Sequence, residues 1–313
     1  MQRFKNILLV AGGDGWEGAA LKRAVALAKN NRARLSVVDV VEELPRDMRV
    51  LVTSMHPADL QKLVVAERLK DLKRLSEQIL NKGVKVTAKV LVGTPFLEII
   101  REVLRNKHDL VMKTAWGGSK LKEVIFGSTA MHLMRKCPCP VWVIKATHRK
   151  KYSRIMAAVD PDPLDKKRNA LNAKIMELAT SLARTEGSEL HVVHAWRLYG
   201  ETLLSGRGRM RQSEVDKLVR KARKEHEGWV AELVGKFAPH IPKGGIHLLK
   251  GNAEALIPAL TKRRKFELIV MGTICRTGLA GFIVGNTAEN ILQQVNCSVL
   301  TVKPDGFVSP VKR

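Results

Sequence analysis

The chain has 313 residues, enough for two domains of ordinary size that each bury a hydrophobic core. Hydrophobic residues make up 45% of the sequence and aromatic residues only 4%, which predicts an aliphatic core of the kind found in parallel sheets covered by helices. No stretch approaches the roughly 20 continuous apolar residues of a membrane-spanning helix, and the first residues lack a signal-peptide pattern, so we expect a cytoplasmic protein.

The formal net charge of +25 is unusual for a chain of this length. Such a charge attracts anionic partners, including nucleotides, nucleic acid and membrane lipid head groups. The basic residues are spread through both halves, and no aromatic residues alternate with them as in a surface that stacks single-stranded bases. A solvated basic surface is therefore one interpretation, and binding of nucleic acid or anionic lipid is the alternative.

The first half alternates predicted strands and helices. Residues 7–11 form a buried-strand pattern, a glycine-rich break follows, and a helical pattern leads to a second strand at residues 35–41. This β-α-β order predicts parallel pairing with a right-handed crossover. The remaining predicted elements are a helix at 58–80, a strand at 84–92, a helix starting at Thr94 and Pro95, a strand at 109–112, a helix at 128–135 and a strand at 141–144.

The second half repeats this plan after a short basic linker at residues 148–153. A polar segment at residues 200–208 follows its second predicted strand. The predicted elements are strands at 155–159, 189–195, 246–249, 268–271 and 299–302, and helices at 169–184, 213–237 and 253–261.

Two matched segments show that the halves are copies of each other. Val111-Met112-Lys113-Thr114 matches Val270-Met271-Gly272-Thr273, and Gly127-Ser128-Thr129-Ala130 matches Gly285-Asn286-Thr287-Ala288. We therefore predict two tandem domains, residues 1–147 and 154–313, each a doubly wound five-stranded parallel sheet with helices on both faces. Such sheets bind ligands beyond the carboxyl ends of their strands, where the strand order reverses.

The stretch at residues 270–288 has the pattern of a buried strand, a glycine-rich loop and a helix start. Glycine allows a ligand close to the backbone, Asn286 or Thr287 can cap the helix, and free N–H groups at a helix start favour an anion. The stretch is thus a candidate phosphate site. The same glycines also mark an ordinary strand-to-helix turn, so both interpretations stay open.

Three motifs resemble those of the universal stress protein family in its tandem two-domain form. They are Met-Gly-Thr-x-x-Arg-Thr-Gly at 271–278, Gly-Asn-Thr-Ala-Glu-Asn at 285–290 and Val-Lys-Pro-Asp at 302–305, and the resemblance covers nearly the whole chain. It implies a Rossmann-like fold of the adenine nucleotide alpha hydrolase type. It also implies that the last strands, 141–144 and 299–302, pair antiparallel within the chain, while a homodimer of two chains stays open.

In the nucleotide-binding branch of this family, the resemblance implies that ATP is held by a carboxylate closing the first strand and by the motif Gly-x2-Gly-x9-Gly-(Ser/Thr). In the second half Asp160, Gly272 and Gly285 match, whereas Cys275 replaces the middle glycine and Asn286 the hydroxyl residue. The candidate pocket of the second domain comprises Val159, Asp160, Ala195, Met271, Gly272, Cys275, Gly285, Asn286 and Thr287.

The first half keeps less of the motif. Gly12 stands where Asp160 does, Lys113 replaces the first glycine, and only Gly127 and Ser128 keep the ending. The degenerate pocket of the first domain comprises Gly12, Val40, Lys113, Gly127 and Ser128. We expect no ATP in the first domain and weak or absent binding in the second.

Several side chains have alternative interpretations. Asp160 precedes Pro161 and can be a turn former or a ligand contact. His194 is expected to be structural, and His191, His226 and His247 lie on separate elements without metal-ligand spacing, so no metal is assigned.

The cysteines are interpreted as structural thiols. They lie in or beside predicted core elements, and the Cys-Pro-Cys segment at 137–139 lacks the two-residue gap and the second ligand pair of a zinc site. The four are Cys137, Cys139, Cys275 and Cys297.

No catalytic assembly is visible in the sequence, which has neither a Gly-x-Ser-x-Gly elbow nor a Walker loop. We therefore expect a stress-response binding or scaffold protein without a catalytic centre. The alternatives are ATP binding with slow hydrolysis in the second domain, an apolar ligand in a vacated nucleotide site, and anion binding through the basic surface.

Overall fold

The computed structural model describes residues 4–12, 18–44, 57–115, 126–145, 151–206, 210–273 and 285–313. The chain divides into two compact units, of which unit 1 contains Met1–Lys150 with Phe307–Arg313 and unit 2 contains Lys151–Gly306. The sequence repeat assigns the last residues to the second half, but in the structure this tail belongs to unit 1. There Phe307 is buried, and the hydroxyl of Ser309 donates a hydrogen bond to the carbonyl of Lys136 at 2.8 Å.

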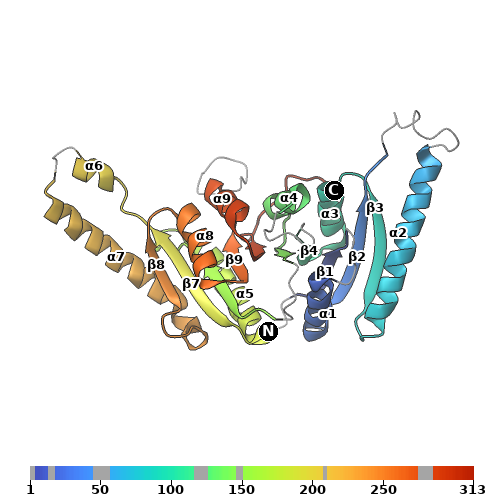
Figure 1. Ribbon diagram of the computed structural model, residues 1–313, viewed down its shortest axis with the longest axis horizontal. Helices are drawn as coiled ribbons and strands as arrows, with labels where there is room; N and C mark the ends of the chain where they lie inside the picture. The colour runs from blue at the N-terminus through green and yellow to red at the C-terminus, as the bar shows by residue number, and fades with distance from the viewer. Residues whose placement is uncertain are drawn as a thin grey trace. The chain divides into compact units, whose positions relative to one another are not determined.

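Unit 1 is a doubly wound parallel sheet with strand order β3-β2-β1-β4-β5 (Figure 1). The buried side chains of its strands are mainly aliphatic, as expected for a sheet covered on both faces. Its elements are β1 (Asn6–Val10), α1 (Ala19–Asn31), β2 (Arg34–Val41), α2 (Pro57–Leu80), β3 (Val86–Val92), α3 (Pro95–Asn106), β4 (Leu110–Thr114), α4 (Ser128–Lys136) and β5 (Val141–Ile144).

Unit 2 repeats this arrangement with strand order β8-β7-β6-β9-β10 and parallel pairing. The predicted fold class and the duplication are therefore confirmed. Its elements are β6 (Arg154–Ala158), α5 (Lys166–Glu186), β7 (Glu189–Trp196), α6 (Glu201–Gly206), α7 (Gln212–Val234), the 3-10 helix η2 (Gly235–His240), β8 (Ile246–Lys250), α8 (Ala253–Arg264), β9 (Leu268–Gly272), α9 (Asn286–Gln294) and β10 (Ser298–Val302).

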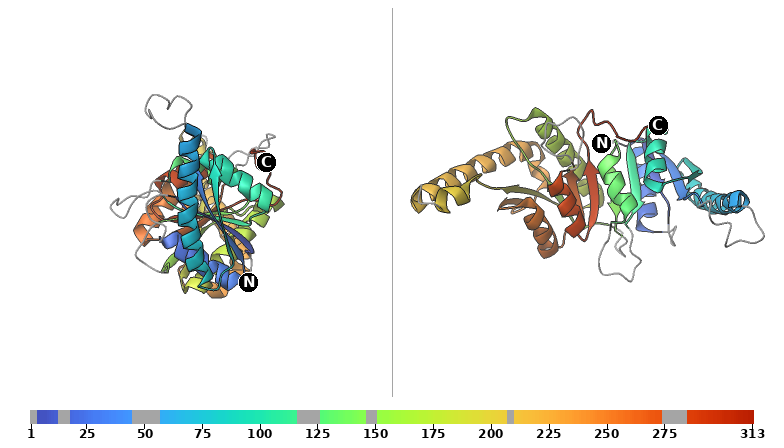
Figure 2. Two further views of the ribbon diagram at one scale, coloured as in Figure 1. Left: turned by 90° about the vertical axis from the view of Figure 1, so that its right-hand side faces the viewer. Right: turned by 90° about the horizontal axis from the view of Figure 1, so that it is seen from above.

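In each unit the strand order reverses next to the first strand, between β1 and β4 and between β6 and β9. Right-handed crossovers then place the helices before and after the reversal on opposite faces. Accordingly α3 contacts α4, and α8 contacts α9, whereas α5 and α7 contact each other. The long helix α2 packs against β2 and β3 and stands in front of the strands in the left-hand view of Figure 2.

One helix was not predicted, and Asn286 does not have its expected capping role. The polar segment after β7 contains helix α6, in which the N–H groups of Leu203 and Leu204 bond to the carbonyl of the preceding Gly200. Asn286 does not cap α9, because Gly285 is the N-cap and makes no side-chain cap hydrogen bond. Asn286 is instead the first helical residue, one position too late for its side chain to act as a cap.

In the described part of the chain, none of the helices combines the length and the hydrophobicity needed to cross a bilayer.

The packing of Gly272 gives a first testable prediction. A Cβ at this position would lie 2.8 Å from Cδ2 of Leu171 and 3.6 Å from Cδ1 of Ile175, both on α5. Gly272→Ala should therefore destabilise the protein by about 1 to 3 kcal/mol through overpacking, measured by urea unfolding.

The control is Gly228→Ala in α7, where a Cβ would meet nothing within 4 Å. Because alanine favours a helix interior over glycine, this variant should be more stable by about 0.5 to 1 kcal/mol. Equal effects of the two substitutions would contradict the packing role assigned to Gly272.

Candidate functional site

In unit 2, Asp160 directly follows the first strand at the reversal of strand order. Its N–H donates to Oδ1 of Asn172 at 3.0 Å, which fixes the backbone at the strand end. Its carboxylate lies 3.6 Å from a guanidinium nitrogen of Arg168, and its side chain is 43% exposed. Asp160 thus lies where the sequence predicts a ligand-facing carboxylate, held in place by its own backbone hydrogen bond.

Arg168 lies in the first turn of α5, and its guanidinium is close to three carboxylates that precede the helix. It is 3.0 Å from Asp162 and 3.4 Å from Asp165, in addition to its contact with Asp160. A hydrogen bond from the Arg168 N–H is the main cause that lowers the pKa of the Asp165 carboxyl. These three carboxylates already neutralise the guanidinium of Arg168 within the protein, so this side chain is not a free cation for a triphosphate.

His194 is buried on β7 and joins three elements. Its Nδ1 lies 3.2 Å from the carbonyl oxygen of Val159, and its Nε2 lies 2.9 Å from Nδ1 of His226 on α7. The His226 ring stacks on Trp196 with ring centroids 5.3 Å apart, and burial lowers the pKa of His226. Both ring nitrogens of His194 have partners, as expected for a structural histidine.

The other predicted residues of the unit 2 pocket lie at the neighbouring strand ends or the start of α9. Met271 and Gly285 are buried, Ala195 and Gly272 are half-buried, and Asn286 and Thr287 are exposed. Cys275 lies outside the described residues. Gly285 has a φ of −65°, so its backbone conformation does not require glycine.

A buried lysine near these strand ends was not predicted as a site residue. Lys303 follows β10, is 2% exposed, and donates from Nζ to Oγ1 of the buried Thr273 at 2.5 Å. The only sequence signal for it was the Val-Lys-Pro-Asp motif at 302–305.

In unit 1 the corresponding strand ends hold an internal charge cluster. Asp39 on β2 is buried, accepts a hydrogen bond from the Val40 N–H at 2.9 Å, and lies 3.7 Å from Nε of Arg68 on α2. Burial raises the pKa of Asp39, and attraction to Arg68 and Lys113 opposes that rise. Burial lowers the pKa of Lys113, and Asp39 opposes that change.

Gly12, at the end of the first strand, lies beside this cluster, since a Cβ there would be 3.8 Å from Oδ1 of Asp39. Gly127 and Ser128 start α4, with Gly127 as N-cap and no side-chain cap. Sequence reasoning identified Gly12 and Lys113 but missed Asp39, which looked like part of an ordinary strand.

The two units carry their strand-end carboxylate at different positions. The match of Val37-Val38 with Val192-Val193 makes Asp39 the counterpart of His194. Each of these residues contacts a side chain from the long helix after its strand, Arg68 on α2 and His226 on α7. In unit 1 the carboxylate is therefore on the second strand and its side chain is 8% exposed, whereas in unit 2 it follows the first strand, lies near Arg168 and is 43% exposed.

Away from the strand ends, two further histidines form a pair in unit 2. Nδ1 of His191 lies 3.1 Å from Nε2 of His247, the rings stack, and both lie against Phe266. Burial lowers the pKa of both, and that of His247 falls to about 4. Within the described residues, no group of His, Cys, Asp and Glu side chains is arranged to hold a metal ion.

The thiols of Cys137 and Cys139 are buried, and their sulfur atoms lie 3.6 Å apart. Hydrogen bonding to Cys137 and burial raise the pKa of Cys139. Both properties fit structural thiols with low reactivity.

The fold and the position of the strand-end sites define a tandem, doubly wound α/β protein. The model of the universal stress protein family matches residues 3–145 and 151–303, one match for each unit, so the chain belongs to the universal stress protein family.

Full-length relatives share this tandem form. The chain is 30% identical over 314 residues to universal stress protein E of Escherichia coli K12, covering all of this chain and 98% of that protein. It is 29% identical to universal stress protein E of Photorhabdus laumondii, covering 99% of that protein.

Solved structures agree with the fold. A protein of unknown function from Pseudomonas aeruginosa PAO1 matches 97% of this chain and 94% of its own, with a TM-score of 0.73 and 24% identity. A universal stress protein from Archaeoglobus fulgidus has a TM-score of 0.62 and 18% identity, covering 95% of this chain and 98% of its own.

The charge cluster of unit 1 predicts a pH-dependent effect of Lys113→Met. Removing this cation leaves the buried Asp39 carboxylate with less compensation, so the variant should lose about 1 to 3 kcal/mol of stability near neutral pH. Because the folded-state pKa of Asp39 is already raised, the loss should shrink as pH falls and Asp39 becomes protonated.

Urea unfolding at several pH values measures this effect. The double variant Asp39→Asn/Lys113→Met should recover most of the loss, since it removes both charges. A loss that is independent of pH, or no recovery in the double variant, would contradict the cluster.

The histidine pair predicts a loss of stability in mild acid. The unfolded chain binds protons from about pH 6.5 downward, whereas the folded state resists protonation of His247 until about pH 4. Stability from this pair is therefore complete above pH 6.5 and declines between these values. His247→Gln should flatten that decline in urea unfolding, whereas His240→Gln, at an exposed position, should leave it unchanged.

Proposed function

We propose that this chain is a cytoplasmic, non-catalytic binding protein of the stress response whose ligand contact lies in unit 2. The asymmetry of the strand ends carries the proposal. In unit 1, Asp39 and Lys113 interact with each other within the protein, and Asp39 also pairs with Arg68. In unit 2, Asp160 is 43% exposed at the end of the first strand.

Ligand binding in unit 2 would act by changing the surface or the assembly of the protein. His194 joins the strand that carries Asp160 to β7 and α7, so a ligand at Asp160 would contact a set of elements that are already bonded together. The pairing of residues 141–144 with residues 299–302, and any association of two chains, stay predictions.

The affinity for ATP distinguishes this proposal from its alternative, in which unit 2 is an ATP-binding domain. The pairing of Arg168 with three carboxylates and the loss of the middle glycine both oppose a triphosphate. We therefore expect ATP with magnesium to bind with a Kd no tighter than about 100 μM, which corresponds to about −5.5 kcal/mol.

Isothermal titration of the purified protein tests this expectation. Asp160→Ala is the site variant, and Asp216→Ala, on α7, is a matched control of equal charge. Saturable binding at low micromolar ATP that Asp160→Ala weakens and Asp216→Ala does not would favour the alternative, an ATP-binding unit 2. Phosphate release above the rate of a buffer control would contradict the non-catalytic assignment.

A further inference from the structure

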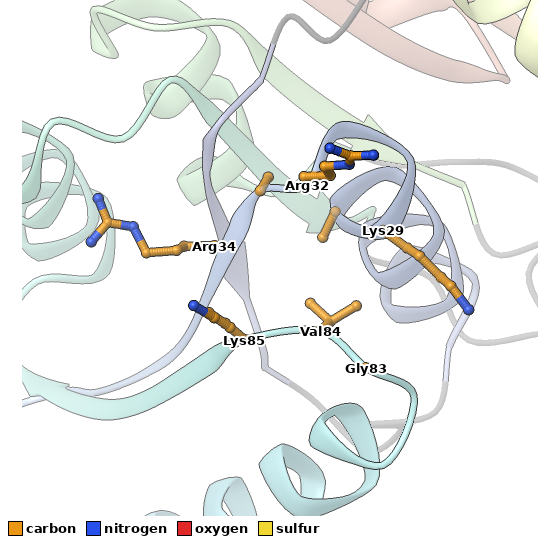
Figure 3. A pocket seen from close by; sticks show the side chains of 8 residues that line it. Lys29, Arg32, Arg34, Gly83, Val84 and Lys85 are labelled. Atoms are coloured by element: carbon orange, nitrogen blue, oxygen red, sulfur yellow. The ribbon is translucent and has the colours of Figure 1, made fainter.

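A pocket lies where strands of unit 1 begin, at the opposite end of the strands from the site described above. Basic side chains surround it. It lies where α1 ends, β2 begins and the turn after α2 leads into β3, with a volume of about 570 Å³ (Figure 3). Its lining residues are Ala28, Lys29, Arg32, Ala33, Arg34, Gly83, Val84 and Lys85. We call the four basic members, Lys29, Arg32, Arg34 and Lys85, the basic rim.

The basic rim has no neutralising partner in the described part of the chain. All four side chains are exposed, no lining residue is acidic, and none of the four makes an ion pair with a described residue. The carboxylate of Asp109, just before β4, bonds to the N–H groups of Lys5 and Asn6. The rim is therefore an uncompensated concentration of positive charge.

The starts of the corresponding strands in unit 2 carry different side chains. The backbone bonds of Arg34 to Lys5 and of Glu189 to Ser153 show that Arg34 and Glu189 are counterparts. Glu189 there pairs with Arg154 at 2.9 Å, and the carboxylates of Glu186 and Glu267 bond to the N–H groups of Tyr152 and Ser153. The fold thus does not require a cationic edge, and the basic rim is specific to unit 1.

The backbone conformation of Arg32 is unusual for a residue with a side chain. It caps α1 in the left-handed region with a φ of 50°, where its counterpart in unit 2 is Gly187 with a φ of 70°. Glycine adopts this conformation without the penalty that a side chain incurs. Arg32 therefore occupies a backbone conformation that glycine would adopt without this penalty, as do Lys107 after α3 and Lys265 after α8.

The shape and composition of the pocket indicate the kind of anion. In Figure 3 the charged ends of Lys29, Arg32 and Arg34 point in different directions away from Val84, so they do not converge on one small ion. The floor residues Ala28, Ala33 and Val84 are 1%, 7% and 3% exposed, which leaves little apolar surface for a lipid tail. No lining residue is aromatic, so bases have nothing to stack on.

We propose that the basic rim binds the phosphate backbone of nucleic acid without reading its sequence. Cations that point in different directions around one rim can each contact a different phosphate of a strand, and such contacts release counterions and give salt-dependent affinity. This site is separate from the strand-end site of unit 2 and does not depend on the function proposed for it.

The test is fluorescence anisotropy of a labelled DNA duplex of about 30 base pairs, in two unrelated sequences, over a series of salt concentrations. The rim variant Lys29→Gln/Arg32→Gly/Arg34→Gln/Lys85→Gln should bind at least about tenfold more weakly at low salt. Its slope of log affinity against log salt should fall by about 3 to 4, or about 0.9 for each lost phosphate contact.

The control variant removes the same number of charges from exposed positions on α7, through Lys217→Gln/Arg220→Gln/Lys221→Gln/Lys224→Gln. It should keep most of the affinity and the slope. Equal losses in the two variants would overturn the proposal, because binding would then follow net charge alone. Binding to phosphatidylserine vesicles that the rim variant loses, with DNA binding unchanged, would also overturn it.

Arg32→Gly alone separates binding from folding. Its melting temperature should be unchanged or higher, since the position favours glycine, while its affinity for DNA falls. A lower melting temperature with unchanged affinity would show that Arg32 only stabilises the end of α1, and would overturn its place in the site. ATP titration of the rim variant should match that of the unaltered protein.

Discussion

The contact between the second strand of each sheet and the long helix that follows it determines what the strand ends can hold. In unit 1 this contact is Asp39 with Arg68, and in unit 2 it is His194 with His226. The strand residue of each contact, Asp39 or His194, is buried, where a neutral polar group without a partner would cost about 1 to 3 kcal/mol and a charged group more. In each unit the buried strand residue therefore keeps its partner on the long helix, and the other charged residues of the site lie around this pair.

That arrangement explains how two copies of one fold come to differ at equivalent positions. Once an acid occupies the second strand in unit 1, a side chain at Gly12 would start with its Cβ 3.8 Å from Oδ1 of Asp39, so a second carboxylate there would meet like charge. Lys113 supplies the missing positive charge instead. In unit 2 the histidine leaves room for a carboxylate at Asp160, and Gly272 admits the close packing of α5.

Much of this was visible in the sequence. Matched segments and the period of hydrophobic residues predicted the alternating strands and helices and the duplication, because buried parallel strands leave a strong pattern. Asp39 was missed because one acid inside a strand has no pattern of its own, and its partners come from residues far along the chain. The histidine pairs were missed for the same reason. The basic rim needed the three-dimensional fold, since it joins the ends of α1 and α2.

The central claim is that only unit 2 presents a ligand-facing strand end. Methyl NMR of the whole protein, labelled at methionine, tests it most directly, because Met112 and Met271 are equivalent buried reporters beside Lys113 and Gly272. On titration with millimolar ATP and magnesium, the account predicts that the Met271 signal shifts and the Met112 signal does not. A shift of Met112 as large as that of Met271 would contradict it.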